Sequence, residues 1–116
     1  MKYPAVVLAR HRVAVELSGT TGRSASLLYA DDHWRRPRTV RAGHRVVDFQ
    51  ACGTGRAASS YDGRPATFWS GFVLTTRPRC LTLRVWVDDE PGPRRAHIGL
   101  GERCGEGQGR SYSASR

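Results

Sequence analysis

The stretch CLTLRVWVDD, residues 80–89, places an aliphatic residue at every second position from Leu81 to Val87. Successive side chains of a β-strand point to opposite faces, so this pattern predicts a strand with one aliphatic face buried and the other toward solvent. The residues on that second face are Thr82, Arg84 and Trp86.

Six more segments have the composition or alternation of strands, with glycine, proline or aspartate in the turns between them. About seven short strands in this arrangement predict an all-β fold, a single antiparallel β-sandwich of immunoglobulin-like or similar type. We expect this domain to span residues 1–104 and residues 105–116, rich in glycine and serine, to form a flexible tail. The six segments are Ala5–Ala9, Arg12–Ser18, Ala25–Tyr29, Arg45–Ala51, Ala66–Thr76 and Arg95–Leu100.

Residues 53–58, GTGRAA, match the dinucleotide-binding pattern G-x-G-x-x-[GA] after an acceptable strand. Such a turn must lead into a helix whose N-terminus meets the phosphates, with an acid for the ribose about twenty residues further on. The only helix candidate, Arg56–Tyr61, is cut short by Gly63 and Pro65, and the expected acid is absent. The segment is therefore predicted to be a strand end and a loop, and no nucleotide cofactor is expected.

The three cysteines lack the close spacing of a zinc site, even with His97 as a fourth ligand. A symmetrical hairpin around the DEPGP segment, residues 89–93, would instead place Cys80 opposite Cys104, at a distance that a disulfide spans. This register assumes a loop without a bulge. We predict one disulfide between Cys80 and Cys104; the alternatives are three buried thiols, or Cys52 paired with one of the other two.

The chain has 19 lysine and arginine residues against 10 aspartate and glutamate residues, a net charge of +9. This balance favours anionic partners such as nucleic acid, acidic lipid or a cell-wall polymer. Lys2 is the single lysine and asparagine is absent, which is typical of a gene with very high G+C content. Part of the arginine excess is thus explained by mutational bias, without a selected binding surface.

Several short motifs in residues 5–104 resemble those of a known group. The chain resembles a loose group of uncharacterised actinobacterial proteins that carry a small β-sandwich and are usually exported or tethered by an N-terminal anchor. The resemblance implies a fold and a location but no reaction. The motifs are Phe49, Ala51 and Cys52, then Trp69-Ser70-Gly71-Phe72, Pro78-Arg79-Cys80 and Gly101-Glu102-Arg103-Cys104.

The sequence after Met1 has no signal-peptide layout, and no apolar run reaches the roughly 18 residues of a membrane span. The group that the chain resembles carries an upstream signal or anchor. We therefore expect an extracytoplasmic protein if the true start lies upstream of Met1, and a cytoplasmic one otherwise.

Catalytic residues are not predicted. The four histidines are scattered, no G-x-S-x-G motif occurs, and the acidic pairs lie in apparent turns, where acids usually serve the turn itself. No metal ligands or cofactor are expected either. An enzyme would require the fold to bring one of the histidines to an acid.

The most concentrated candidate for binding is HWRRPRTVRAGHR, residues 33–45, where five arginines surround a tryptophan and two histidines. Arginine forks suit phosphate or carboxylate groups, and tryptophan can stack on a base or a sugar. The alternative is a solvated loop with the tryptophan folded onto the sandwich. Arg84 and Trp86 form a second candidate surface, unless Trp86 is a core residue beneath a loop. The candidate residues are Trp34, Arg35, Arg36, Arg38, Arg41, Arg45, Arg84 and Trp86.

Two functions follow from these features. The first is a noncatalytic extracytoplasmic module that binds an anionic polymer or a protein at the cell surface, with one disulfide bracing the last hairpin. The second is a cytoplasmic basic β-barrel that binds nucleic acid through residues 33–45. The oligomeric state is not predicted.

Overall fold

The computed structural model describes residues 1–18, 24–29, 33–51 and 59–105, and this part of the chain contains nine strands and two short 3₁₀ turns. Residues 53–58 with the glycine-rich pattern, Cys52 and most of the expected tail lie outside these ranges. The strands are β1 (Ala5–Leu8), β2 (Arg12–Leu17), β3 (Ala25–Leu28), β4 (Val46–Gln50), β5 (Ser59–Tyr61), β6 (Arg64–Trp69), β7 (Phe72–Thr75), β8 (Arg79–Val87) and β9 (Arg94–Leu100). The 3₁₀ turns are η2 (His33–Arg35) and η3 (Val40–Ala42).

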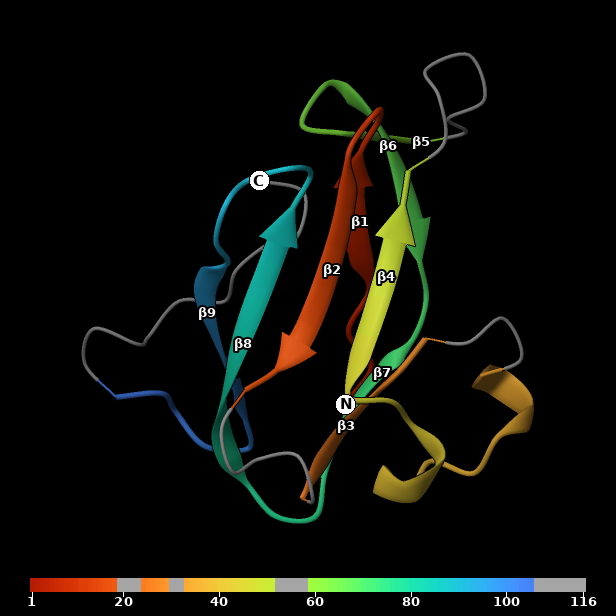
Figure 1. Ribbon diagram of the computed structural model, residues 1–116. Coiled ribbons are helices and arrows are strands. Elements are labelled where there is room, and N and C mark those ends of the chain that lie inside the picture. The colour runs from red at the N-terminus through yellow and green to blue at the C-terminus, as the bar shows by residue number, and fades with distance from the viewer. Residues whose placement is uncertain (19–23, 30–32, 52–58, 106–116) are drawn as a thin grey trace.

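All strand pairs are antiparallel, and the strands form three sheets in the orders β4-β2-β8-β9, β1-β6-β5 and β3-β7. Figure 1 shows the four-stranded sheet in front and the two smaller sheets behind it. The predicted all-β class with antiparallel pairing is confirmed. The described residues form three sheets and nine strands, however, in place of one sandwich of about seven.

The two additional strands have local causes. The segment expected as one strand, Ala66–Thr76, is divided into β6 and β7 at Ser70 and Gly71, so that β6 pairs with β1 and β7 with β3. A Cβ atom on Gly71 would lie 2.2 Å from the Tyr29 ring, so only glycine fits at the crossing.

The second additional strand is β5, which contains the end of the segment considered as a helix, Arg56–Tyr61. Asp62 and Gly63 both have positive φ angles, 53° and 76°, and join β5 to β6. Two such residues form the tight turn that suits a two-residue hairpin loop. The described end of the segment, residues 59–61, is therefore a strand of a hairpin.

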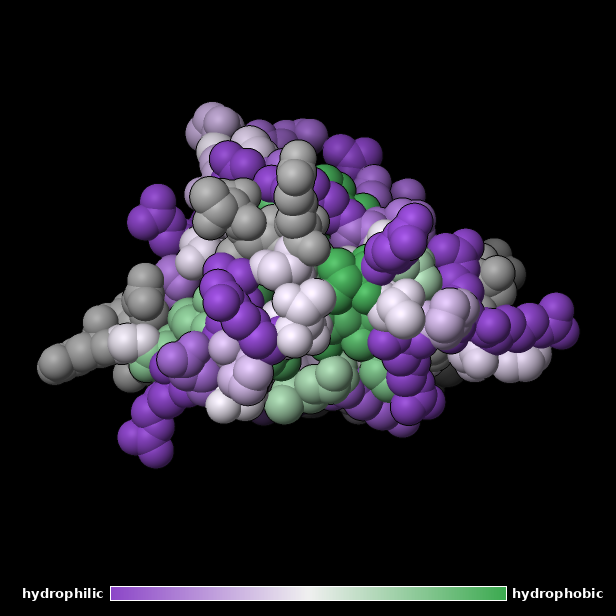
Figure 2. Space-filling view, turned by 90° about the horizontal axis from the view of Figure 1, so that it is seen from below, coloured by the Kyte–Doolittle hydropathy of each residue, from purple (hydrophilic) through white to green (hydrophobic). Residues whose placement is uncertain are grey.

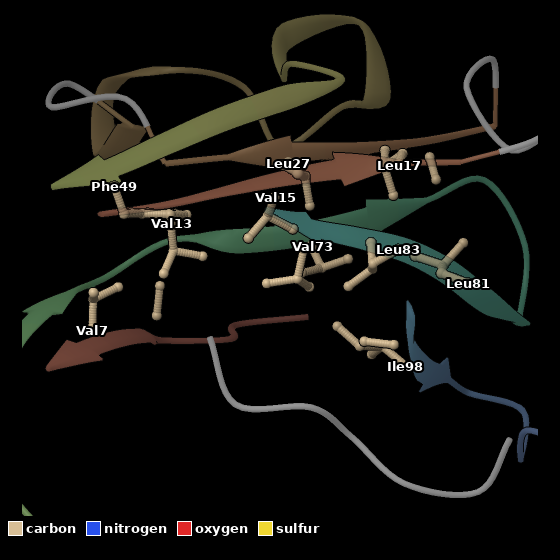
Figure 3. Packing of buried hydrophobic residues seen from close by; sticks show 14 of the residues in the cluster. Val7, Val13, Val15, Leu17, Leu27, Phe49, Val73, Leu81, Leu83 and Ile98 are labelled. Atoms are coloured by element: carbon tan, nitrogen blue, oxygen red, sulfur yellow. The ribbon is translucent and has the colours of Figure 1, made fainter. Parts of the chain in front are cut away.

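The predicted alternation on β2 and β8 is confirmed. Val13, Val15 and Leu17 are buried on β2, and the aliphatic positions of β8 are buried while Arg84 and Trp86 are exposed. Figure 3 shows the labelled side chains of both layers pointing into one interior space. From below, apolar surface is visible at the centre of the molecule between hydrophilic side chains (Figure 2). The interior is therefore not sealed by polar groups at this end.

The predicted disulfide between Cys80 and Cys104 is present, with the two Cα atoms 4.9 Å apart. The register that led to it is wrong, because Cys80 pairs with Gly99. The observed pairs are centred between Asp89 and Glu90 and not on Gly92: Asp88 takes a positive φ directly after β8, and residues 91–93 lie on the side of β9. Pro91 and Pro93 have no N–H to donate to a ladder, which favours a turn that precedes them.

Cys104 reaches Cys80 by a reversal of the chain after β9. Gly101 has a φ of +68°, which turns the backbone, and the following residues fold back over Gly99. A Cβ on Gly99 would lie 2.4 Å from the carbonyl oxygen of Glu102. Two glycines thus create the space in which the disulfide closes.

Candidate functional site

The arginine-rich segment between β3 and β4 forms the two 3₁₀ turns, at the lower right of Figure 1. Trp34 in η2 is 67% exposed, and the guanidinium of Arg35 lies 4.5 Å from the centre of its ring. The alternative of a tryptophan folded onto the sandwich is therefore wrong. The guanidinium of Arg38 lies 4.4 Å from the ring centre of Phe72 on β7. Two cations are thus held over two aromatic rings.

These aromatic residues border a groove with a volume of about 590 Å³, here called the cationic groove. Lys2 pairs with Phe72 across an antiparallel bridge, so the two side chains point to the same side of the sheet. The groove therefore gathers the charges of Lys2 and Arg38 beside exposed aromatic surface. Its lining residues are Met1, Lys2, Trp34, Arg38, Ser70, Gly71, Phe72 and Leu74.

Arg38 is the one arginine of the segment among the lining residues, and Arg35 adjoins the groove through its contact with Trp34. Arg36 donates a hydrogen bond from Nη1 to the carbonyl of Ala42, 3.3 Å away, and so closes the segment on itself. Arg41 at the end of η3 and Arg45 before β4 are exposed. The backbone carbonyl of Arg45 accepts a hydrogen bond from the Leu17 N–H, which anchors the segment to β2.

The second predicted surface, Arg84 and Trp86, lies on the outer face of β8. Glu16 on β2 contacts both residues. One of its carboxylate oxygens lies 3.1 Å from Arg84 Nε and accepts a hydrogen bond from the indole N–H of Trp86 at 3.3 Å. Trp86 is 39% exposed, which excludes the alternative of a core residue beneath a loop. This second surface already contains a carboxylate, that of Glu16.

One histidine does meet an acid. Nδ1 of His11 lies 2.6 Å from Oδ2 of Asp88, and the N–H of Arg12 donates to Oδ1 at 2.9 Å. These bonds, the backbone bond first, lower the pKa of the Asp88 carboxyl. The adjoining cleft of about 280 Å³ is otherwise lined by Arg10, Gln50, Ala51 and Asp89. The bonds to His11 and Arg12 connect the turn at Asp88 to the start of β2.

His97 Nδ1 lies 3.3 Å from the hydroxyl of Thr82, on the β8–β9 pair, and His44 pairs through its backbone with Leu27. His33 belongs to η2. In the described ranges, no three His, Cys, Asp or Glu side chains gather in a way that could hold a metal ion. The same ranges contain no helix of the length and apolarity that crossing a bilayer requires.

Sequence reasoning missed Lys2, Phe72 and Leu74 as groove residues. The strand bridge between residues 2 and 72 brings Lys2 to Phe72, and no local pattern reports a contact at that separation. Phe72 belongs to a motif noted for resemblance alone. Phe72 and Thr75, at the two ends of β7, are half-buried, whereas the two central residues of this strand are buried.

Comparison with known proteins found no matching family model, no similar curated protein and no similar solved structure. The function of the groove is therefore inferred from its own side chains.

Proposed function

We propose that this protein is a noncatalytic extracytoplasmic module that binds an anionic polymer of the cell surface in the cationic groove. The observation that carries the proposal is the placement of Arg35 over Trp34 and of Arg38 over Phe72 beside Lys2. The fold that we infer for this module is an opened β-sandwich whose back layer is divided into two sheets.

Stacking prepares a guanidinium for anion binding. A ring beneath the planar group restricts its rotamers and stabilises its charge, while the N–H groups at its edge remain able to donate. A phosphate or carboxylate can then accept two parallel hydrogen bonds from one arginine. Arg35 ends η2 and Arg38 follows three residues later, so the two arginines suit repeated anionic groups along one chain.

The proposed location rests on the disulfide. Cys80 and Cys104 are joined, and disulfides persist in oxidising compartments while cytosolic thiols are kept reduced. The resemblance to exported or anchored actinobacterial proteins agrees with this location. A cell-surface polymer is therefore favoured over nucleic acid, although the exposed Trp34 could also stack on a base.

The test compares two polyanions at 150 mM salt: poly(glycerol phosphate), which has no bases, and an oligothymidylate of equal charge. The variant is the double substitution Arg35→Ala and Arg38→Ala. Affinity for poly(glycerol phosphate) should fall at least about tenfold, because each hydrogen bond to a charged group contributes roughly 1.5–3 kcal/mol. Isothermal titration calorimetry measures the change.

The matched control is Arg64→Ala with Arg95→Ala, which removes the same charge from exposed positions on β6 and β9. If both double variants lose affinity equally, net charge alone drives binding and the groove proposal is wrong. If the oligothymidylate binds and poly(glycerol phosphate) does not, the nucleic-acid hypothesis replaces the proposed one. Its salt slope would then count the phosphates engaged.

A further inference from the structure

A second space, unrelated to the cationic groove, lies between the two layers of strands. This cavity has a volume of about 330 Å³. Its deep wall consists of side chains that are at most 9% exposed and come from both layers, and Figure 3 shows several of them directed into the same interior. These deep residues are Val15, Leu27, Phe49, Val73, Leu83, Val85 and Ile98.

The mouth of the cavity lies at one edge of the fold. Pro4 is exposed, and Tyr3, Val6 and Tyr61 are half-buried, in contrast to the deep wall. β1 and β9 are each the outermost described strand of their sheets, and both contribute lining residues. The cavity therefore occupies the seam where the front and back layers are not joined by strand pairing.

The wall of the cavity is apolar, and the hydroxyl group of Tyr29 does not change this. The hydroxyl of Tyr29 donates its hydrogen bond to the Tyr3 carbonyl, so this buried polar group is satisfied within the protein. Burial, with a smaller contribution from Tyr3, raises the pKa of Tyr29, which keeps the phenol neutral. Tyr29 and Phe49 meet edge to face with ring centres 5.3 Å apart and form an aromatic side of the wall.

We propose that this cavity binds a small, uncharged and mostly apolar molecule about the size of a bicyclic aromatic ring. Protein interiors are close-packed, and voids larger than a water molecule are few. An apolar cavity of roughly 150 Å³ stays dry and takes up benzene, and this one is about twice as large. Its volume also falls within the range of about 300–1,000 Å³ that ligand pockets occupy. The site is separate from the cationic groove and does not depend on its function.

The chain offers two unique NMR reporters, because it contains one isoleucine and one methionine. Ile98 lines the cavity and Met1 lines the cationic groove. With ¹³C-methyl labels on both, titration with 1-naphthol should shift the Ile98 δ1-methyl resonance in a saturable way and leave Met1 unchanged. The anion 1-naphthalenesulfonate has the same rings and should leave Ile98 unchanged, despite the net charge of +9 that attracts it.

A substitution that fills the cavity tests the location of binding. Ala5 lines the cavity on β1, and Ala5→Leu should abolish the saturable shift. The matched control is Ala14→Leu on the outer face of β2, which should bind 1-naphthol as the original protein does. Thermal unfolding of Ala5→Leu at or above the original temperature would show that the filled protein is folded.

Three results would overturn the proposal. The first is an Ile98 methyl resonance that stays unmoved up to the solubility limit of 1-naphthol. The second is equal binding by Ala5→Leu and the original protein, and the third is an equal shift of Ile98 by the sulfonate. None of these results depends on polymer binding in the groove, so the two proposals fail independently.

Discussion

The two ends of the β8–β9 hairpin are held by different chemistry. At the end where β8 begins, the half-buried Cys80 is joined covalently to Cys104. At the turn, Asp88 accepts a hydrogen bond from the Arg12 N–H and pairs with His11, and the His11 and Asp88 side chains are 48% and 39% exposed. The disulfide connects the hairpin to the segment that follows it in the chain, and the contacts of Asp88 connect it to His11 and Arg12, which precede it.

The difference predicts how each end fails. A disulfide limits the freedom of the unfolded chain and is broken by a thiol reductant. An exposed ion pair is screened by solvent and contributes at most about 1 kcal/mol, and only while its groups are charged. The hairpin should therefore loosen at one end under reducing conditions and at the other in acid.

Loss of the disulfide should have the largest effect. Cys104→Ala should lower the free energy of unfolding by about 3.5 kcal/mol, the cost that chain entropy predicts for two cysteines 24 residues apart. Thermal unfolding followed by circular dichroism measures the change, and dithiothreitol should reproduce it in the original protein. In protein taken from its native host, Cys80 and Cys104 should resist alkylation until a reductant is added.

Cys52→Ala is the control, since it removes the third cysteine and should leave the melting temperature and its response to dithiothreitol unchanged. If dithiothreitol has no effect on the original protein, the disulfide stabilises the folded state no more than the pair of His11 and Asp88 does. Three thiols that alkylate without reductant would contradict the extracytoplasmic proposal and favour the cytoplasmic nucleic-acid hypothesis.

Gly99→Ala should have the second largest effect. The new methyl group would lie 2.4 Å from the carbonyl oxygen of Glu102, so the chain that carries Cys104 must move away. Overpacking of this kind costs about 1–3 kcal/mol. Urea denaturation should show this loss, and alkylation should show more free thiol at Cys80 than in the original protein.

Gly92→Ala in the turn provides the comparison, because a Cβ there meets no atom within 4 Å. Its stability should change by no more than about 0.5 kcal/mol. An equal loss in both variants would indicate that the close approach at Gly99 is unimportant, because an effect through the unfolded chain would stabilise both variants.

The two ends also differ in how far the sequence predicts them. The cysteine pairing was predicted, but from a register centred on Gly92, whereas the observed pairs are centred between Asp89 and Glu90. Alternation along β8 specifies which face is buried, and it does not specify the partner of each residue. The position of the turn depends on Asp88 adopting a positive φ, and the run of acidic and proline residues in this loop does not show which residue will do so.

Other differences have similar causes. The dipeptide Asp62-Gly63 is a strong hairpin signal, yet β5 has three residues, too few to show alternation. The sequence predicts Arg84 and Trp86 as a second candidate surface, but it does not predict that Glu16 reaches Arg84 across a strand pair. Contacts such as His11 with Asp88 join residues far apart in the chain, which no local pattern reports.

The smallest effect is expected at the ionic end. Hydrogen bonds from Arg12 and His11 lower the pKa of Asp88 below its unfolded value of about 3.9. The ionised form is thus favoured in the folded state, so its contribution is present above the unfolded pKa and is lost as the pH falls through the folded pKa. Asp88→Asn should remove this dependence, at a cost below about 1 kcal/mol at neutral pH.

Asparagine is the informative replacement because it tolerates the positive φ of 47° and keeps an oxygen for the Arg12 N–H, so that only the charge is lost. Urea denaturation from pH 2 to 6 should give a flatter stability profile for Asp88→Asn than for the original protein. Asp48→Asn, an exposed change on β4 of the same sheet, should keep the original profile. Identical profiles for all three proteins would mean that the pair with His11 contributes nothing, and that Asp88 serves the turn through its backbone alone.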